Sequence, residues 1–114
     1  MDAEVFSRSP GGRYCVYTRP WEAKMSHWVS PPIVRDDGAA ETLFAPVDSR
    51  WSATSTQWLS DDVLRLELCR YPGDHQPATL TVDIDCRARL AQLAGKQVPL
   101  EGLERALCST LGAP

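Results

Sequence analysis

Asparagine is absent from this chain of 114 residues, and lysine occurs only twice, at Lys24 and Lys96. Without asparagine the chain offers no acceptor for N-linked glycosylation. Arginine therefore supplies ten of the twelve basic residues, a skew that is typical of proteins from GC-rich bacterial genomes. We interpret this composition as a sign of ancestry rather than of a particular chemistry.

Long runs of one residue class are also missing. No stretch of arginine and lysine forms a basic stripe, and the net charge is −3, so binding to nucleic acid or to another polyanion is not expected. No apolar run is long enough to cross a bilayer, and the acidic amino-terminal sequence lacks the apolar centre of a secretory signal. We therefore expect a cytoplasmic protein that does not contact membranes.

The spacings that metal sites require are absent as well. The four cysteines contain no Cys-x-x-Cys pair, and neither histidine is placed to complete a zinc site. The aspartate pairs do not follow the spacing of a calcium loop. We predict no metal and no cofactor, and we expect reduced, mostly buried thiols, whereas an exported protein could form two disulfides of undetermined pairing. The cysteines are Cys15, Cys69, Cys86 and Cys108.

Hydrophobic alternation is the strongest structural signal that the sequence does contain. Every second residue is apolar within Val63–Tyr71 and again within Thr79–Asp85, which predicts half-buried strands of an antiparallel sheet. Weaker strands are predicted at 13–19, 27–35, 41–45 and 56–59. Pro31 and Pro32 interrupt the second of these and place it at a sheet edge or a bulge. Residues 21–26 are expected to form a loop. The inward-facing residues of the two clearest strands are Leu64, Leu66, Leu68, Leu80, Val82 and Ile84.

After Cys86 the apolar period lengthens to that of a helix. Leu90 and Leu93 predict a short helix that Gly95 closes, and a second helix is predicted to begin near Pro99. The predicted fold is thus α+β: a single domain over residues 1–114, with a meander of about six antiparallel strands at 12–85 and one or two helices at 86–111 packed on that single layer. The leucines expected to face the sheet are Leu100, Leu103, Leu107 and Leu111.

Two turn motifs resemble those of a known β-rich family. Ser9-Pro-Gly-Gly-Arg-Tyr14 resembles the Ser-Pro-Asp-Gly-Arg-Tyr turn in blades of TolB-type β-propellers, with Gly11 where the family has aspartate. Trp51-Ser-x5-Trp58-x-Ser-Asp61 resembles the start of a second blade. The resemblance covers about a third of the chain. It implies hairpins with tight polar turns and strands anchored by tryptophan, although 114 residues cannot close a propeller of four-stranded blades.

A second resemblance concerns function. The segments Arg19–Glu22, Met25–Trp28, Trp51-Ser and Arg70–His75 together resemble a group of small bacterial proteins. Some small acidic proteins of this size are immunity partners of secreted toxins, so this class analogy implies a role in binding another protein.

The leading hypothesis is a non-enzymatic module that binds a partner protein, most concretely a cognate toxin whose basic active-site cleft it occludes. Aromatic side chains would supply binding energy, and carboxylates would speed the encounter. No catalytic residue is assigned, and Trp51 and Trp58 are expected in the core. The predicted partner-binding residues are Trp21, Trp28, Asp36, Asp37, Arg70, Tyr71, Asp74, His75 and Asp83.

Two alternatives remain open. In the first, the chain is a small-ligand binder or a hydrolase-like enzyme that uses His27 and His75 with nearby carboxylates, which would require the two histidines to converge in a concave site. In the second, an edge strand pairs with a second copy of the chain. The sequence leaves the oligomeric state open.

Overall fold

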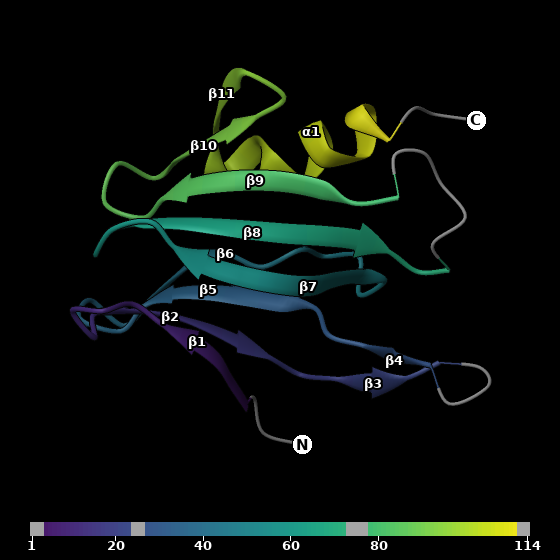
Figure 1. Cartoon of the computed structure of the whole chain (residues 1–114), viewed down its shortest axis with the longest axis horizontal. Coiled ribbons are helices and arrows are strands. Elements are labelled where there is room, and N and C mark those ends of the chain that lie inside the picture. The colour runs from purple at the N-terminus through teal and green to yellow at the C-terminus, as the bar shows by residue number, and fades with distance from the viewer. Residues whose placement is uncertain (1–3, 24–26, 73–77, 112–114) are drawn as a thin grey trace.

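The structure, a computed structural model, describes residues 4–23, 27–72 and 78–111. Within these ranges, eleven strands form two antiparallel sheets and a two-stranded ribbon, followed by a 3-10 turn and one α-helix. Figure 1 shows the two sheets, with the helix near one side and the ribbon at the other. The α+β class and the antiparallel pairing are confirmed.

The amino-terminal sheet has the strand order β1-β2-β5-β6. Its strands are β1 (Glu4–Arg8), β2 (Tyr14–Thr18), β5 (Pro32–Asp36) and β6 (Glu41–Phe44). The ribbon consists of β3 (Trp21–Glu22) and β4 (Trp28–Val29), which lie in sequence between β2 and β5. The ribbon therefore extends the β2–β5 pair towards one end of the molecule (Figure 1).

The carboxyl-terminal sheet is a five-stranded meander with the order β11-β10-β9-β8-β7. In its centre, Leu64, Leu66 and Leu68 lie directly opposite Ile84, Val82 and Leu80. All six are buried, so the alternation predicted for these two strands is confirmed. The strands are β7 (Trp51–Trp58), β8 (Val63–Arg70), β9 (Leu80–Asp85), β10 (Leu90–Leu93) and β11 (Lys96–Pro99).

One hydrophobic cluster joins the two sheets and the helix. Helix α1 (Leu103–Thr110) follows a 3-10 turn at Leu100–Gly102 and contacts β10 and β11. The predicted leucine stripe is confirmed because all four of its members are buried in this cluster. Trp51 is fully buried, as expected, and Trp58 packs against the cluster from its margin. The amino-terminal sheet contributes Tyr14, Val16, Val34 and Phe44.

The predicted single layer of about six strands is wrong, and so is the predicted helix at 86–95. The strands divide between two sheets and the two-stranded ribbon, and β10 and β11 form a hairpin. Ala91 and Leu93 are buried on either side of exposed Gln92, which is a period of two and not of 3.6. Ala94 and Gly95 have φ values of 51° and 79°, as a two-residue type I′ turn requires. Gly95 therefore reverses the chain instead of ending a helix.

The proline-containing strand shows a mixed outcome. The predicted strand is interrupted at Pro31, between β4 and β5, but β5 lies between β2 and β6 and not at an edge. Pro32 is the first residue of β5, a position that tolerates proline inside a sheet. Trp21 and Glu22, predicted to lie in a loop, form β3. The strand predicted at 56–59 corresponds to the end of β7, which begins earlier, at Trp51, and ends at Trp58; a bulge between Ala53 and Ser55 breaks its alternation.

Both turn motifs lie in hairpins. The turn after Ser9 joins β1 to β2, with the Gly12 amide donating to the Ser9 carbonyl at 2.9 Å. The second motif covers β7 and the turn to β8. Trp58 connects the two hairpins, because its Nε1 donates to Ser7 Oγ at 2.8 Å.

The four cysteines have free thiols, and Cys15 and Cys86 are buried. Burial raises the pKa of the Cys86 thiol to about 12, so this side chain packs as a small hydrophobic group. Among the described residues, no helix has the length and apolar character needed to cross a membrane.

Candidate protein-binding surface

The ribbon and the end of β8 bring three aromatic side chains together. The ring of Tyr71 lies 6.3 Å from that of Trp21 in an edge-on arrangement and 5.0 Å from that of His27. Trp21 Nε1 also donates a hydrogen bond to the Ser49 carbonyl at 2.9 Å. We call Trp21, His27 and Tyr71 the aromatic cluster. These contacts attach one face of the ribbon to the body of the molecule.

The other face of the ribbon carries Trp28. In the ribbon, Trp21 lies opposite Val29 and Glu22 lies opposite Trp28, and residues directly opposite one another share a face. Val29 is fully buried, whereas 58% of Trp28 is exposed. The ribbon therefore holds a large exposed indole on a support that is packed from behind.

Arg70, another predicted partner-binding residue, is partly buried beside the core. Its guanidinium carbon lies 5.9 Å from the centroid of the Trp51 ring, and its Nη1 lies 3.9 Å from Cys108 Sγ. Arg70 therefore joins the end of β8 to helix α1 and adjoins the aromatic cluster through Tyr71.

Three of the predicted acidic residues, Asp36, Asp37 and Asp83, lie elsewhere and have partners within the chain. Asp36 is 4% exposed and accepts two hydrogen bonds from Arg13, both at 2.9 Å. Asp83 forms a similar pair with Arg65 at 2.9 and 3.0 Å. The Asp36 carboxylate is too deeply buried to meet a partner, so we leave it out of the surface. Asp74 and His75 lie outside the described residues.

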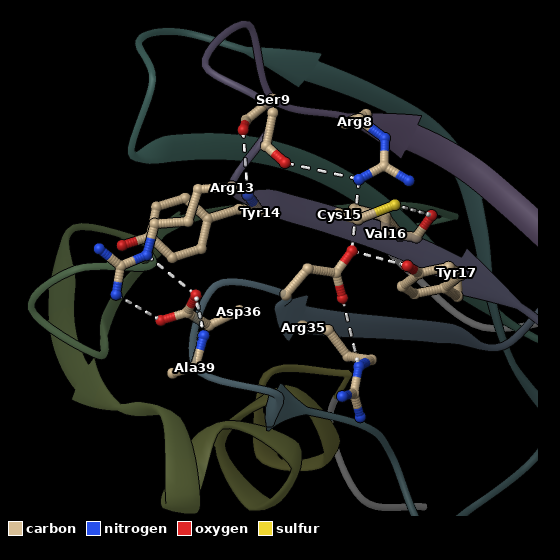
Figure 2. Close-up of polar contacts among 12 residues, drawn as sticks. Arg8, Ser9, Arg13, Tyr14, Cys15, Val16, Tyr17, Arg35, Asp36 and Ala39 are labelled. Atoms are coloured by element: carbon tan, nitrogen blue, oxygen red, sulfur yellow. Dashed lines mark hydrogen bonds and ion pairs between the residues drawn. The ribbon is translucent and has the colours of Figure 1, made fainter.

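Asp37, at the end of β5 distant from the ribbon, organises a polar network on the outer face of the amino-terminal sheet. Its carboxylate accepts from Tyr17 Oη at 2.6 Å, from Arg8 Nη1 at 3.3 Å and from Arg35 Nε at 3.4 Å. Figure 2 shows Arg8, Tyr17 and Arg35 along this face, with Arg13 and Asp36 beside it. We call Arg8, Tyr17, Arg35 and Asp37 the Asp37 network.

Sequence reasoning did not find the other three members of this network. Tyr17 and Arg35 alternate with the buried residues Val16 and Val34, so strand alternation alone predicts that both side chains face outward. Their convergence on one carboxylate depends on the register in which Cys15 lies opposite both Arg8 and Arg35, and a single sequence does not specify that register.

The network shifts the ionisation of two of its members. The hydrogen bond from Tyr17, with those from Arg35 and Arg8, holds the pKa of the Asp37 carboxyl below its ordinary value, against an opposing contribution from burial. The same hydrogen bond raises the pKa of Tyr17, because ionised Tyr17 would face a carboxylate. Both shifts favour the state in which Asp37 is charged and Tyr17 is neutral.

Acid is therefore expected to destabilise the protein partly through Asp37. Because its pKa is lower in the folded chain, the stabilisation is present above the unfolded value of about 4 and is lost as the pH falls through the folded value. Urea unfolding between pH 7 and pH 2 should show a shallower loss of stability for Asp37→Asn than for the wild type. Glu4→Gln, an exposed substitution on β1, should retain the wild-type slope; equal slopes for all three proteins would contradict this account.

The enzyme alternative stays a prediction. His27, next to β4 of the ribbon, lies against Tyr71. The enzyme alternative also requires His75, which is outside the described residues. Among the residues that the structure describes, no group of three or more His, Cys, Asp or Glu side chains could hold a metal ion. Comparisons with protein families, curated proteins and solved structures found no match to this chain.

Proposed function

We propose that this chain is a non-enzymatic protein-binding module whose principal contact surface is the β3–β4 ribbon. The observation that carries the proposal is the 58% exposure of Trp28 on a ribbon whose opposite face is packed against Tyr71. Tryptophan is among the residues that contribute most to binding energy at protein interfaces. A support that is already ordered reduces the entropy lost when the indole becomes buried.

The position of the ribbon favours this role. It lies at one end of the molecule, on the side away from helix α1 and the β10–β11 hairpin (Figure 1). A partner could therefore cover Trp28 without displacing any element of the core.

The narrower form of the proposal is that the partner is a cognate toxin and that this chain blocks its active site. It rests on the class analogy with immunity proteins. Of the carboxylates first considered for this role, Asp36, Asp37 and Asp83 are engaged by arginines of the same chain. Aromatic contacts, rather than these carboxylates, would then supply most of the affinity.

The test uses the product of the gene adjacent to that of this protein. We expect Trp28→Ala to weaken the complex by about 30-fold or more in isothermal titration calorimetry, as the loss of a dominant interface residue does. Leu59→Ala is the matched control, because Leu59 is also a large apolar residue, 44% exposed, on a turn outside the ribbon. Both variants should unfold at the wild-type temperature.

Two results would count against the proposal. One is a complex that loses no more affinity with Trp28→Ala than with Leu59→Ala. The other is the absence of any complex with the neighbouring gene product. The toxin form is tested separately, by whether the wild-type chain abolishes the enzymatic activity of that product while Trp28→Ala does not.

A further inference from the structure

The outer face of the amino-terminal sheet contains a hollow beside the Asp37 network. Its volume is about 380 Å³, and it spans β2, β5 and β6. Among the described residues, two guanidinium groups line it and no carboxylate does, although the chain as a whole carries a net charge of −3. The lining residues are Tyr17, Arg19, Ile33, Arg35, Thr42 and Ala45.

The two arginines differ in how they are held. Arg35 donates through Nε to Asp37 at 3.4 Å and through Nη1 to Thr42 Oγ1 at 3.2 Å, so its guanidinium is fixed while Nη2 has no protein partner within the described residues. Arg19 is exposed, and within the same ranges its guanidinium forms no ion pair. The hollow thus combines one pre-positioned cation with one that is free to adjust to a ligand.

The charge of this face is not balanced locally. Arg8 and Arg35 both pair with Asp37, and Arg19 adds a third guanidinium. Three positive charges and one negative charge leave an excess of two positive charges. The planar fork of a guanidinium matches a carboxylate, which can accept two parallel hydrogen bonds from it.

Part of the remaining lining is apolar. Ile33 lies directly opposite Tyr17 across β2 and β5, and Ala45 follows β6. An inorganic anion would leave the apolar surface of Ile33 and Ala45 exposed to water. A ligand that carries a carboxylate beside an apolar group would use both parts.

We propose that this hollow binds an acidic segment of the partner protein, with a glutamate or aspartate carboxylate on Arg19 and Arg35 and an adjacent apolar side chain over Ile33. The inference rests on the proposed protein-binding function and specifies the chemistry of the partner. A small metabolite fits less well, because sites for such ligands enclose most of the ligand surface and Arg19 is exposed at this one. Two guanidiniums on a chain with a net charge of −3 are too few to hold a nucleic-acid backbone.

A synthetic peptide tests the proposal without the natural partner. The probe is acetyl-Leu-Glu-Leu-Glu-Leu-Glu-amide, compared with the same peptide in which glutamine replaces each glutamate. Titration followed by amide NMR shifts should move the signals of Arg19, Ile33 and Thr42, with at least tenfold weaker binding of the glutamine peptide. Arg19→Gln should weaken binding of the glutamate peptide at least fivefold. Arg105→Gln, at an exposed arginine on α1, should change it less than twofold.

The proposal is overturned if the two peptides bind equally, if the shifts lie away from the hollow, or if Arg19→Gln behaves like Arg105→Gln. It is also overturned if sodium phosphate or benzoate gives the same shifts at the same concentration, because the site would then be one for small anions. Repeating Arg19→Gln and Trp28→Ala in the complex with the neighbouring gene product separates the two proposals. If only Trp28→Ala weakens the complex, the proposed protein-binding function stands and the proposal that the hollow binds an acidic segment is overturned.

Discussion

Replacing Leu66 with alanine is expected to lower the free energy of unfolding by about 2–5 kcal/mol, the range for large-to-small substitutions in a packed core. Leu66 is fully buried in β8, between Thr56 on β7 and Val82 on β9. The substitution removes apolar surface from a position enclosed by strands on both sides, and the backbone there cannot easily move to fill the space. Equilibrium urea unfolding followed by circular dichroism measures the loss.

Two control variants make the Leu66 result specific. Leu66→Met conserves most of the volume and should cost less than about 1.5 kcal/mol. Leu59→Ala removes the same atoms from a side chain that is 44% exposed and should cost clearly less than Leu66→Ala. A Leu66→Ala variant as stable as Leu59→Ala would contradict the placement of β8 in the centre of the core.

Sequence alone predicted the elements whose apolar residues follow one clear period. β8 and β9 alternate without interruption, and the helix stripe from Leu100 to Leu111 repeats at helical spacing, so each pattern admitted one interpretation. The division into two sheets could not be predicted in this way. Alternation shows which face of a strand is buried, but it does not show which strand lies beside it.

The candidate surface was predictable to a similar extent. Trp21, Trp28 and Tyr71 were identified from residue type, and the structure brings Trp21 and Tyr71 into contact. The burial of Asp36 was not predictable, because its carboxylate is held against Arg13, which is 23 residues away in sequence. Ion pairs over such separations depend on strand register, and register is fixed by the whole fold.

This distribution of ion pairs has a consequence for recognition. Asp36, Asp37 and Asp83 each pair with arginines of the same chain, and Arg19 has no such partner in the described part of the chain. A partner that approaches the amino-terminal sheet therefore meets a locally positive surface on a protein of negative net charge. Local charge, rather than net charge, decides which segment of a partner this face favours.

The turn between β10 and β11 yields a prediction that depends on its backbone conformation. Gly95→Ala is expected to destabilise the protein by about 1 kcal/mol, and Gly95→Val by about 2–3 kcal/mol, because Gly95 has φ of 79° and β-branched residues strongly disfavour positive φ. Apart from its two chain neighbours, no described residue has an atom within 4 Å of a Cβ placed on Gly95, so the cost arises from the backbone conformation and not from a collision. In the helix that the sequence predicted for this segment, Gly95 would follow the last helical residue, a position that also favours glycine with positive φ, so these two substitutions test the backbone conformation and do not separate the two architectures.

Ala94→Gly provides the reciprocal test. Ala94 has φ of 51°, so glycine at this position relieves strain and should stabilise the hairpin by several tenths of a kcal/mol, whereas in a helix the same change would cost about 1 kcal/mol. Thermal and urea unfolding of Ala94→Gly therefore distinguish the two architectures by the sign of the change, and the Gly95 variants test the turn conformation. If Gly95→Ala raised the stability and Ala94→Gly lowered it, β10 and β11 would not form the turn described, and the carboxyl-terminal sheet would end at β9.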